Sequence, residues 1–301
     1  MKRLMATSKA SFAYRIEPVL YLLPFLIGLV IFTVYPFISV IIISFKNNYH
    51  ILTGASAGFG FENYRYIFYD RDFISALKNT SLYVLFTVPI STALSIFFAI
   101  MLNMKVKLVG FFQTAFFMPM VTSVTAVGLV WKWFYNFDFG LFNYLLSLFG
   151  IKAINWLNDP AFALTSIIIY GIWNILPITV IIILSGLQSI NPHYAKAAEV
   201  DGAGPLLIFR RITLPLLAPT VALALIINVI STSKVFTELF PLFNGRPGPA
   251  FSLYTVVYYI YDMFYLKWRL GPASASAVIL FLIVFAFTML QLIIQRKWIH
   301  F

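Results

Sequence analysis

The side chains best able to do chemistry in this chain are a few polar and aromatic ones set within or beside long apolar segments. Polar groups are costly to bury in such surroundings, and they are often functional. Aromatic faces, amides and hydroxyls together can bind a hydroxyl-rich solute. The candidate residues for a solute path are Tyr170, Trp173, Asn174, Asn228, Ser231, Thr232, Lys234 and Glu238.

These residues also have a structural interpretation. Small polar residues such as Asn228 and Ser231 commonly hold membrane helices together. Lys234 and Glu238 are four positions apart, so on a helix they would share a face and could form an ion pair near the outer boundary. Pro177 would kink its helix and so open a cavity nearby. Both interpretations stay open at the level of sequence.

The sequence lacks the residues that metal binding, nucleotide binding, ion coupling and catalysis would need. The chain has no cysteine, and its three histidines lie far apart without ligand spacing, so we expect no metal site. The phosphate-binding pattern Gly-x-x-x-x-Gly-Lys-Ser/Thr is missing, so this chain is not expected to bind ATP or another nucleotide cofactor. The long apolar segments contain no acidic residue, which disfavours an ion-coupled secondary transporter. An enzyme would need clustered His, Asp or Glu, which the sequence also lacks.

Composition determines the elements that must position the candidates. Of 301 residues, 61% are hydrophobic and 10% are charged, against about 25% charged in a soluble domain. A membrane helix needs roughly 20 apolar residues, and helices satisfy their own backbone in lipid. Six charge-free stretches are long enough: Pro18–Phe45, Asn79–Met104, Leu108–Trp131, Pro160–Ala195, Ile212–Ser233 and Leu270–Gln295. We therefore predict an all-α integral membrane protein with six transmembrane helices, the fourth at about Ala161–Leu187.

The distribution of charge predicts the orientation. Six spans place both termini on one side of the membrane, and that side carries more lysine and arginine in short segments and fewer acids than the other. The positive-inside rule then puts both termini in the cytoplasm. Residues 1–17 are expected to form a cytoplasmic arm, and residues 18–301 a single transmembrane domain. The net charge of +11 is explained by this orientation, without a nucleic-acid partner.

One cytoplasmic segment, HYAKAAEVDGAGPLLIFRRITLPLLAP (residues 193–219), has an unusual pattern. Asn191-Pro192 is typical of a helix start. An alanine-rich helix is expected over His193–Val200, a glycine turn over 201–204, and a second helix over Pro205–Ile212. Two helix starts and a fixed turn predict a rigid projection, and such projections can transmit force or position.

Two local features are expected at the membrane borders. Pro215 and Pro219 should break or kink the chain as it re-enters the membrane. On the opposite side, aromatic residues precede a short interfacial helix over Leu141–Phe149, closed by Gly150.

The segment resembles the cytoplasmic signature loop of the permease subunits of bacterial ABC importers. That loop has the pattern Glu-Ala-Ala, three residues, Gly, nine residues, Ile, one residue, Leu-Pro. Here Lys196 occupies the position of the glutamate, so the charge is reversed. We hypothesise that Lys196 faces the surface of the protein that binds this loop. The resemblance implies a coupling loop at about 188–215, formed by Lys196, Ala197, Ala198, Glu199, Asp201, Gly202, Ile212, Leu214 and Pro215.

Three further segments are similar to carbohydrate-importer permeases, and to the maltose-permease-F-like member of a two-permease pair in particular. They are Phe59–Thr80, Phe243–Tyr265 and Leu270–Phe281. In the second, only Gly245 and Pro247-Gly248 keep the family's Gly-Gly-Pro-Gly loop.

The resemblance implies a transport subunit and not an enzyme. It would form half of the path for a sugar, beside a second homologous permease in a bacterial cell membrane. A separate cytosolic ATPase dimer would bind ATP and Mg, and an extracellular binding protein would deliver the sugar. The alternatives are a non-sugar cargo within the same superfamily, or a secondary transporter.

Overall fold

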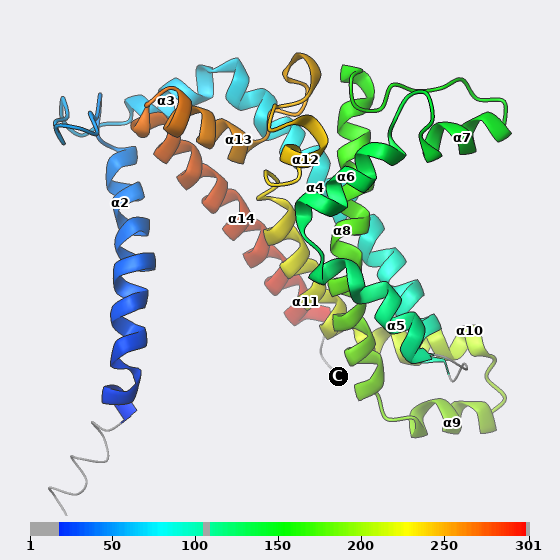
Figure 1. Ribbon diagram of the computed structural model, residues 1–301. Helices are drawn as coiled ribbons and strands as arrows, with labels where there is room; N and C mark the ends of the chain where they lie inside the picture. Colours follow the sequence, from blue (N-terminus) through cyan, green and yellow to red (C-terminus); the bar gives the residue numbers. More distant parts are fainter. Residues whose placement is uncertain (1–17, 105–108, 299–301) are drawn as a thin grey trace, which may run out of the picture.

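A computed structural model describes residues 18–104 and 109–298, and within these residues regular structure is helical apart from one isolated bridge between Lys46 and Phe59 (Figure 1). Five helices are long and apolar enough to cross a membrane, or six if one sharply bent pair counts as a single span. The predicted all-α class is therefore confirmed for the described residues. The basic arm 1–17, Lys105 and Lys107 lie outside them.

The elements follow the predicted spans, with shorter helices between them. The first span, Pro18–Ser44, includes a π-helical turn, η1 (Val30–Val34), and α2 (Tyr35–Ser44). The remaining elements are α3 (Glu62–Tyr69), α4 (Arg71–Asn103), α5 (Val109–Phe117), η2 (Met118–Val121), α6 (Val124–Phe134), α7 (Leu141–Leu148), α8 (Pro160–Ser189), α9 (His193–Val200), α10 (Pro205–Ile208), η3 (Phe209–Thr213), α11 (Leu214–Thr232), α12 (Leu239–Phe243), η4 (Pro249–Phe251), α13 (Val256–Tyr261), η5 (Asp262–Leu266) and α14 (Leu270–Trp298).

The two longest helices, α4 and α8, pack along each other and form the centre of the molecule. Their contact is close because Gly171 of α8 leaves room for Tyr83 of α4: a Cβ at Gly171 would lie 2.2 Å from the tyrosine Oη. Gly186 likewise admits Thr220 of α11. Small residues at such crossings let membrane helices approach closely. α8 matches the predicted fourth span closely.

The second span begins earlier than expected. α4 starts at Arg71, eight residues before Asn79, because the carboxylate of Asp70 caps it by accepting a hydrogen bond from the backbone N–H of Asp72 at 3.0 Å. Charged residues thus form the outer turns of a helix whose apolar part matches the prediction.

The third predicted span, Leu108–Trp131, is sharply bent and counts as one span only if the two segments are taken together. Helical segments at Gln113–Val121 and Val124–Phe134 meet at an angle of 110°. Pro119 lies in the 3-10 turn η2, and Thr122 and Ser123 after it have extended backbones. Proline cannot donate the backbone hydrogen bond that a continuous helix needs. The charge-free run from which the span was predicted gives no indication of this break.

The prediction that Pro215 or Pro219 breaks the chain is wrong. Residues Pro205–Thr232 form one continuous helical rod, in which the π-helical turn η3 joins α10 to α11. Pro215 directly follows η3, in which the Leu214 N–H bonds to the Phe209 carbonyl five residues earlier, and a π-helical turn of this kind lets the helix continue through the proline. The second helix of the coupling segment is therefore the beginning of the fifth span.

The helices divide the molecule into two ends (Figure 1). α9 and α10 lie at one end, together with the C-terminal end of α14, and α3, α7 and α13 lie at the other. The first span stands apart from the central helices and meets α14 through Phe37 and Phe281, whose ring centroids are 5.3 Å apart. Its most apolar stretch has no buried residue.

Candidate functional site

The segment 193–219 has the helix–turn–helix geometry that its sequence predicts. α9 starts where the Asn191 side chain accepts a hydrogen bond from the His193 N–H at 3.0 Å. It ends in a turn with two backbone hydrogen bonds, from Gly202 and Ala203 to carbonyls of the preceding helical turn, at 3.0 and 2.9 Å. Gly202 has φ +83°, in the left-handed region that glycine adopts at little cost. This is the Schellman arrangement, and it fixes the path of the turn.

The side chains of this segment face outward. Within α9, all of whose residues are described, no side chain is buried. Val200 is 88% exposed and Leu206 is 78% exposed, although both are apolar. Of the predicted coupling residues, Ala198 and Ile212 are half-buried, and the exposed ones are Lys196, Ala197, Glu199, Asp201, Gly202, Leu214 and Pro215. Exposed apolar side chains on a rigid projection are typical of an interaction surface.

The predicted solute path divides into a packed part and an open part. Asn228 is 1% exposed, and its side chain joins three helices. It accepts a hydrogen bond from Thr179 of α8 at 3.1 Å and donates one to Thr92 of α4 at 3.4 Å. Thr232 donates to the Asn228 carbonyl at 2.7 Å. Because these groups are paired within the protein, Asn228 and Thr232 act here as helix-packing residues.

Tyr170 and Asn174 line a cavity of about 220 Å³ beside the break in the third span. Tyr170 is fully buried, and its hydroxyl has no hydrogen-bond partner among the described residues. A buried hydroxyl without a partner is costly, whereas Asn174 is exposed and presents its amide to the cavity. Thr122, in the extended stretch after Pro119, lines the same cavity. The sequence identified Tyr170 and Asn174 as candidates, but it did not predict that residues around the break in the third span would line the same cavity.

The remaining path residues lie elsewhere. Trp173 packs against Trp131, with ring centroids 5.4 Å apart, and Ser231 is exposed. The prediction that Lys234 and Glu238 pair on one helix is wrong. α11 ends at Thr232, so both residues lie in the following turns, Lys234 is exposed, and the Glu238 carboxylate accepts hydrogen bonds from its own neighbours, including the Phe236 N–H at 3.0 Å.

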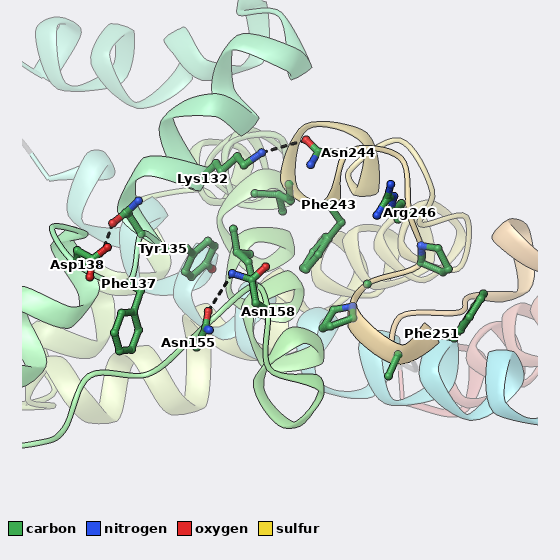
Figure 2. Close-up of a pocket in the computed structure, with 17 residues that line it drawn as sticks. Lys132, Tyr135, Phe137, Asp138, Asn155, Asn158, Phe243, Asn244, Arg246 and Phe251 are labelled. Atoms are coloured by element: carbon green, nitrogen blue, oxygen red, sulfur yellow. Dashed lines mark hydrogen bonds between the residues drawn. The ribbon is translucent and has the colours of Figure 1, made fainter.

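A larger pocket, of about 720 Å³, lies at the end opposite to α9, and it was missed at the level of sequence (Figure 2). Its walls come from the C-terminal end of α6, the chain at 155–158 and the loop 244–251. No motif could have found it, because residues from three distant segments meet there. Lys132 and Arg246 both line it.

Comparison with known proteins gives the family. The family described as "Binding-protein-dependent transport system inner membrane component" matches residues 73–300. The chain belongs to this family. The predicted resemblance to ABC importer permeases is therefore confirmed, and the chain is a multi-pass transport subunit and not an enzyme.

Two relatives match the permease over nearly its whole length. The trehalose/maltose transport system permease protein MalF of Thermococcus litoralis is 30% identical, over 96% of this chain and 97% of the relative. The sulfoquinovosyl glycerol transport system permease protein SmoG of Agrobacterium fabrum is 33% identical, over 94% of this chain and 91% of the relative.

A solved structure shares the permease's fold. A chain of a bacterial alginate ABC transporter, in complex with a periplasmic protein that holds an alginate pentasaccharide, superposes with a TM-score of 0.80. The two chains are 25% identical, and the match covers 95% of the permease and 96% of that chain.

Proposed function

We propose that this permease forms half of the translocation path of an ATP-driven importer for a saccharide, which an extracellular binding protein delivers. Family membership supports transport that depends on a binding protein. The relatives named for trehalose and maltose and for sulfoquinovosyl glycerol, and the alginate transporter of the same fold, support a saccharide cargo.

The observation that carries the mechanism is the rigid projection formed by α9, the Gly202 turn and α10. It presents Val200 and Leu206 to solvent at the end of a continuous span. We propose that this projection lies in the cytoplasm and binds in a cleft of a cytosolic ATPase dimer, which holds ATP and Mg. Both termini lie on the same side, and the host membrane is the bacterial cell membrane.

Coupling follows from the rigidity of this contact. When the ATPases close on ATP, the projection moves with them as a rigid body, because the turn is fixed by hydrogen bonds at both Gly202 and Ala203. The membrane helices then shift between an inward-open and an outward-open state, and nucleotide biases that two-state equilibrium. Lys196 is exposed on α9, and in this proposal it faces an acidic position of the ATPase.

A second homologous permease would complete the path. The first span offers an apolar face, none of whose most apolar stretch is buried. A further hollow of about 360 Å³, with a mainly apolar lining that includes Trp131 and Trp173, opens beside α6. We assign the central solute contact to the cavity at Tyr170 and Asn174, where a saccharide hydroxyl would pair with the exposed Asn174 amide.

The test is transport by the assembled complex in liposomes, with the companion permease, the ATPase and the binding protein. Uptake of labelled sugar should require ATP and the binding protein. Lys196→Glu should weaken ATPase assembly several-fold, since an exposed charge pair contributes up to about 1 kcal/mol and reversal makes it repulsive. The matched control is Lys152→Glu, an exposed lysine at the far end, which should leave assembly unchanged.

Two outcomes contradict the proposal. Solute uptake by the purified chain alone, driven by an ion gradient, would make it a secondary transporter. ATP-dependent uptake of a non-sugar solute, with no saccharide bound by the binding protein, would preserve the mechanism and refute the cargo.

For the solute contact, Asn174→Ala should raise the sugar concentration needed for half-maximal uptake, and unchanged uptake would remove Asn174 from the path.

A further inference from the structure

The pocket bounded by the C-terminal end of α6, residues 155–158 and the loop 244–251 is here called the outer pocket (Figure 2). Its volume of about 720 Å³ lies within the roughly 300–1,000 Å³ typical of small-molecule sites. It is the outermost of three hollows that lie along α6. Val124 and Val127 line the cavity at Tyr170, Val130 and Trp131 line the apolar hollow, and Lys132 lines the outer pocket.

The outer pocket carries unpaired positive charge. Arg246 is exposed, and its guanidinium makes no hydrogen bond or ion pair with any described residue. Lys132 donates one hydrogen bond to the Asn244 Oδ1 at 3.0 Å, which leaves two of its three N–H groups free. A planar guanidinium with free N–H groups matches a carboxylate, which it can bind through two parallel hydrogen bonds.

Four asparagines line the pocket, and in each of them either the amide oxygen or the amide nitrogen has no hydrogen bond to a described residue. Within the described chain, the Oδ1 of Asn136 accepts from two backbone N–H groups, the Oδ1 of Asn155 accepts from Asn158 at 3.2 Å, and Asn244 accepts from Lys132. The unused groups are therefore three amide donors and, at Asn158, one carbonyl acceptor. Asp138 adds a carboxylate at the rim (Figure 2).

The loop that closes the pocket is held in an unusual conformation. Ala250 and Phe251 have φ of +49° and +60°, which is costly for these two residues, and such strain gathers at binding sites. Phe251 is also 70% exposed. Its ring offers an apolar face on the side of the pocket that the loop forms (Figure 2).

We propose that the outer pocket binds an acidic saccharide, with Arg246 and Lys132 holding its carboxylate and the asparagines pairing with its hydroxyls. This rests on the proposed import function, in which the solute arrives at this end. The carboxylates of an acidic protein loop would pair only with the cations and the amide N–H groups. A saccharide also pairs with the acceptors of the pocket, because its hydroxyls donate hydrogen bonds to the Asn158 amide oxygen and the Asp138 carboxylate. Its C–H face also covers the exposed ring of Phe251.

The experiment measures binding to the assembled transporter in nanodiscs, by fluorescence anisotropy. The probes are end-labelled trigalacturonate, which carries carboxylates, and maltotriose, its neutral counterpart. A labelled hexaglutamate peptide reports binding of acidic protein. The variants are Arg246→Gln and Lys132→Gln. The matched control is Arg65→Gln, which removes an exposed arginine of α3 at the same end but outside the pocket.

Trigalacturonate should bind at least tenfold more tightly than maltotriose. Arg246→Gln should weaken it roughly tenfold or more, since a hydrogen bond to a charged group contributes about 1.5–3 kcal/mol. Lys132→Gln should weaken it less, and Arg65→Gln not at all. Equal binding of maltotriose, equal loss in Arg65→Gln, or absence of trigalacturonate binding would overturn the proposal. Tight binding of hexaglutamate instead would make the pocket a protein-docking site.

Failure of this proposal is distinguishable from failure of the import function. If the unaltered transporter takes up a neutral sugar with ATP and binding protein while trigalacturonate does not bind, the outer pocket is not a site for acidic saccharides and the import function stands.

Discussion

Replacing Gly202 by alanine should loosen the turn between α9 and α10. The added Cβ meets no atom within 4 Å, so space is not the obstacle. The obstacle is the backbone, because φ at Gly202 is +83° and a left-handed conformation costs a residue with a Cβ about 1–2 kcal/mol. That free energy raises the open population of the turn by roughly 5–30-fold.

Hydrogen exchange measures this opening directly. The amides of Gly202 and Ala203 donate the two hydrogen bonds of the turn, so their exchange should accelerate roughly 5–30-fold in Gly202→Ala. Gly204→Ala is the matched control: Gly204 is also open to solvent, but its φ is −71°, which alanine adopts without strain. Equal exchange in the Gly202→Ala and original proteins, or equal acceleration in both variants, would refute the backbone argument.

Three further substitutions test packing and charge. Asn143 is buried and makes four hydrogen bonds, one to Phe137 before α7 and three to Ile154 and Trp156 after it, so Asn143→Ala should lower the free energy of unfolding by about 3 kcal/mol, measured by thermal unfolding in detergent. Gly128→Ala would place a Cβ 2.2 Å from Pro241 and should cost about 1–3 kcal/mol through overpacking, read from the same unfolding curves. Burial alone would lower the pKa of Lys267, but the hydrogen bond and charge of Asp262 at 2.8 Å outweigh it and raise that pKa above 10.5. The pair therefore stabilises the protein below pH 10.5. The decrease in the free energy of unfolding caused by Lys267→Met should become smaller as the pH rises past that value.

Each substitution has a control that shares its chemistry. Ser147→Ala removes one exposed local hydrogen bond and should change stability by less than about 0.5 kcal/mol. Gly28→Ala adds a Cβ in open space and should not destabilise. Lys152→Met should show no stability loss that depends on alkaline pH. A loss in any control equal to that of its partner variant would mean that the named contact is not responsible.

The sequence predicts what depends on local pattern. Five of the six apolar stretches and the α9 turn form as expected from runs without charge and from Asn, Pro and Gly at fixed offsets, whereas the third stretch is sharply bent. Asp70 shows the limit of that rule, because a capping carboxylate extends α4 outward into charged residues. A charge-free run marks the part of a helix in lipid, and not the ends of the helix.

The errors arise where tertiary context decides. Pro119 and Pro215 have the same local chemistry, yet the chain breaks beside the first and continues as a helix through the second. Asn228 is a packing residue because Thr92 and Thr179 reach it from two other helices, which spacing along one helix does not reveal. The outer pocket combines three segments, so its residues share no motif.

The uninterrupted rod from Pro205 to Thr232 has a mechanical consequence. Its 28 residues span about 42 Å at 1.5 Å per residue, so a rotation of only about 10°, comparable to subunit rotations in other switching proteins, carries one tip through an arc of roughly 7 Å relative to the other. Leu217, Ala224 and Asn228 of this helix are buried against its neighbours, so those helices have to rotate with it. A small rotation of the packed helices therefore gives a large displacement at the tip beside Gly204.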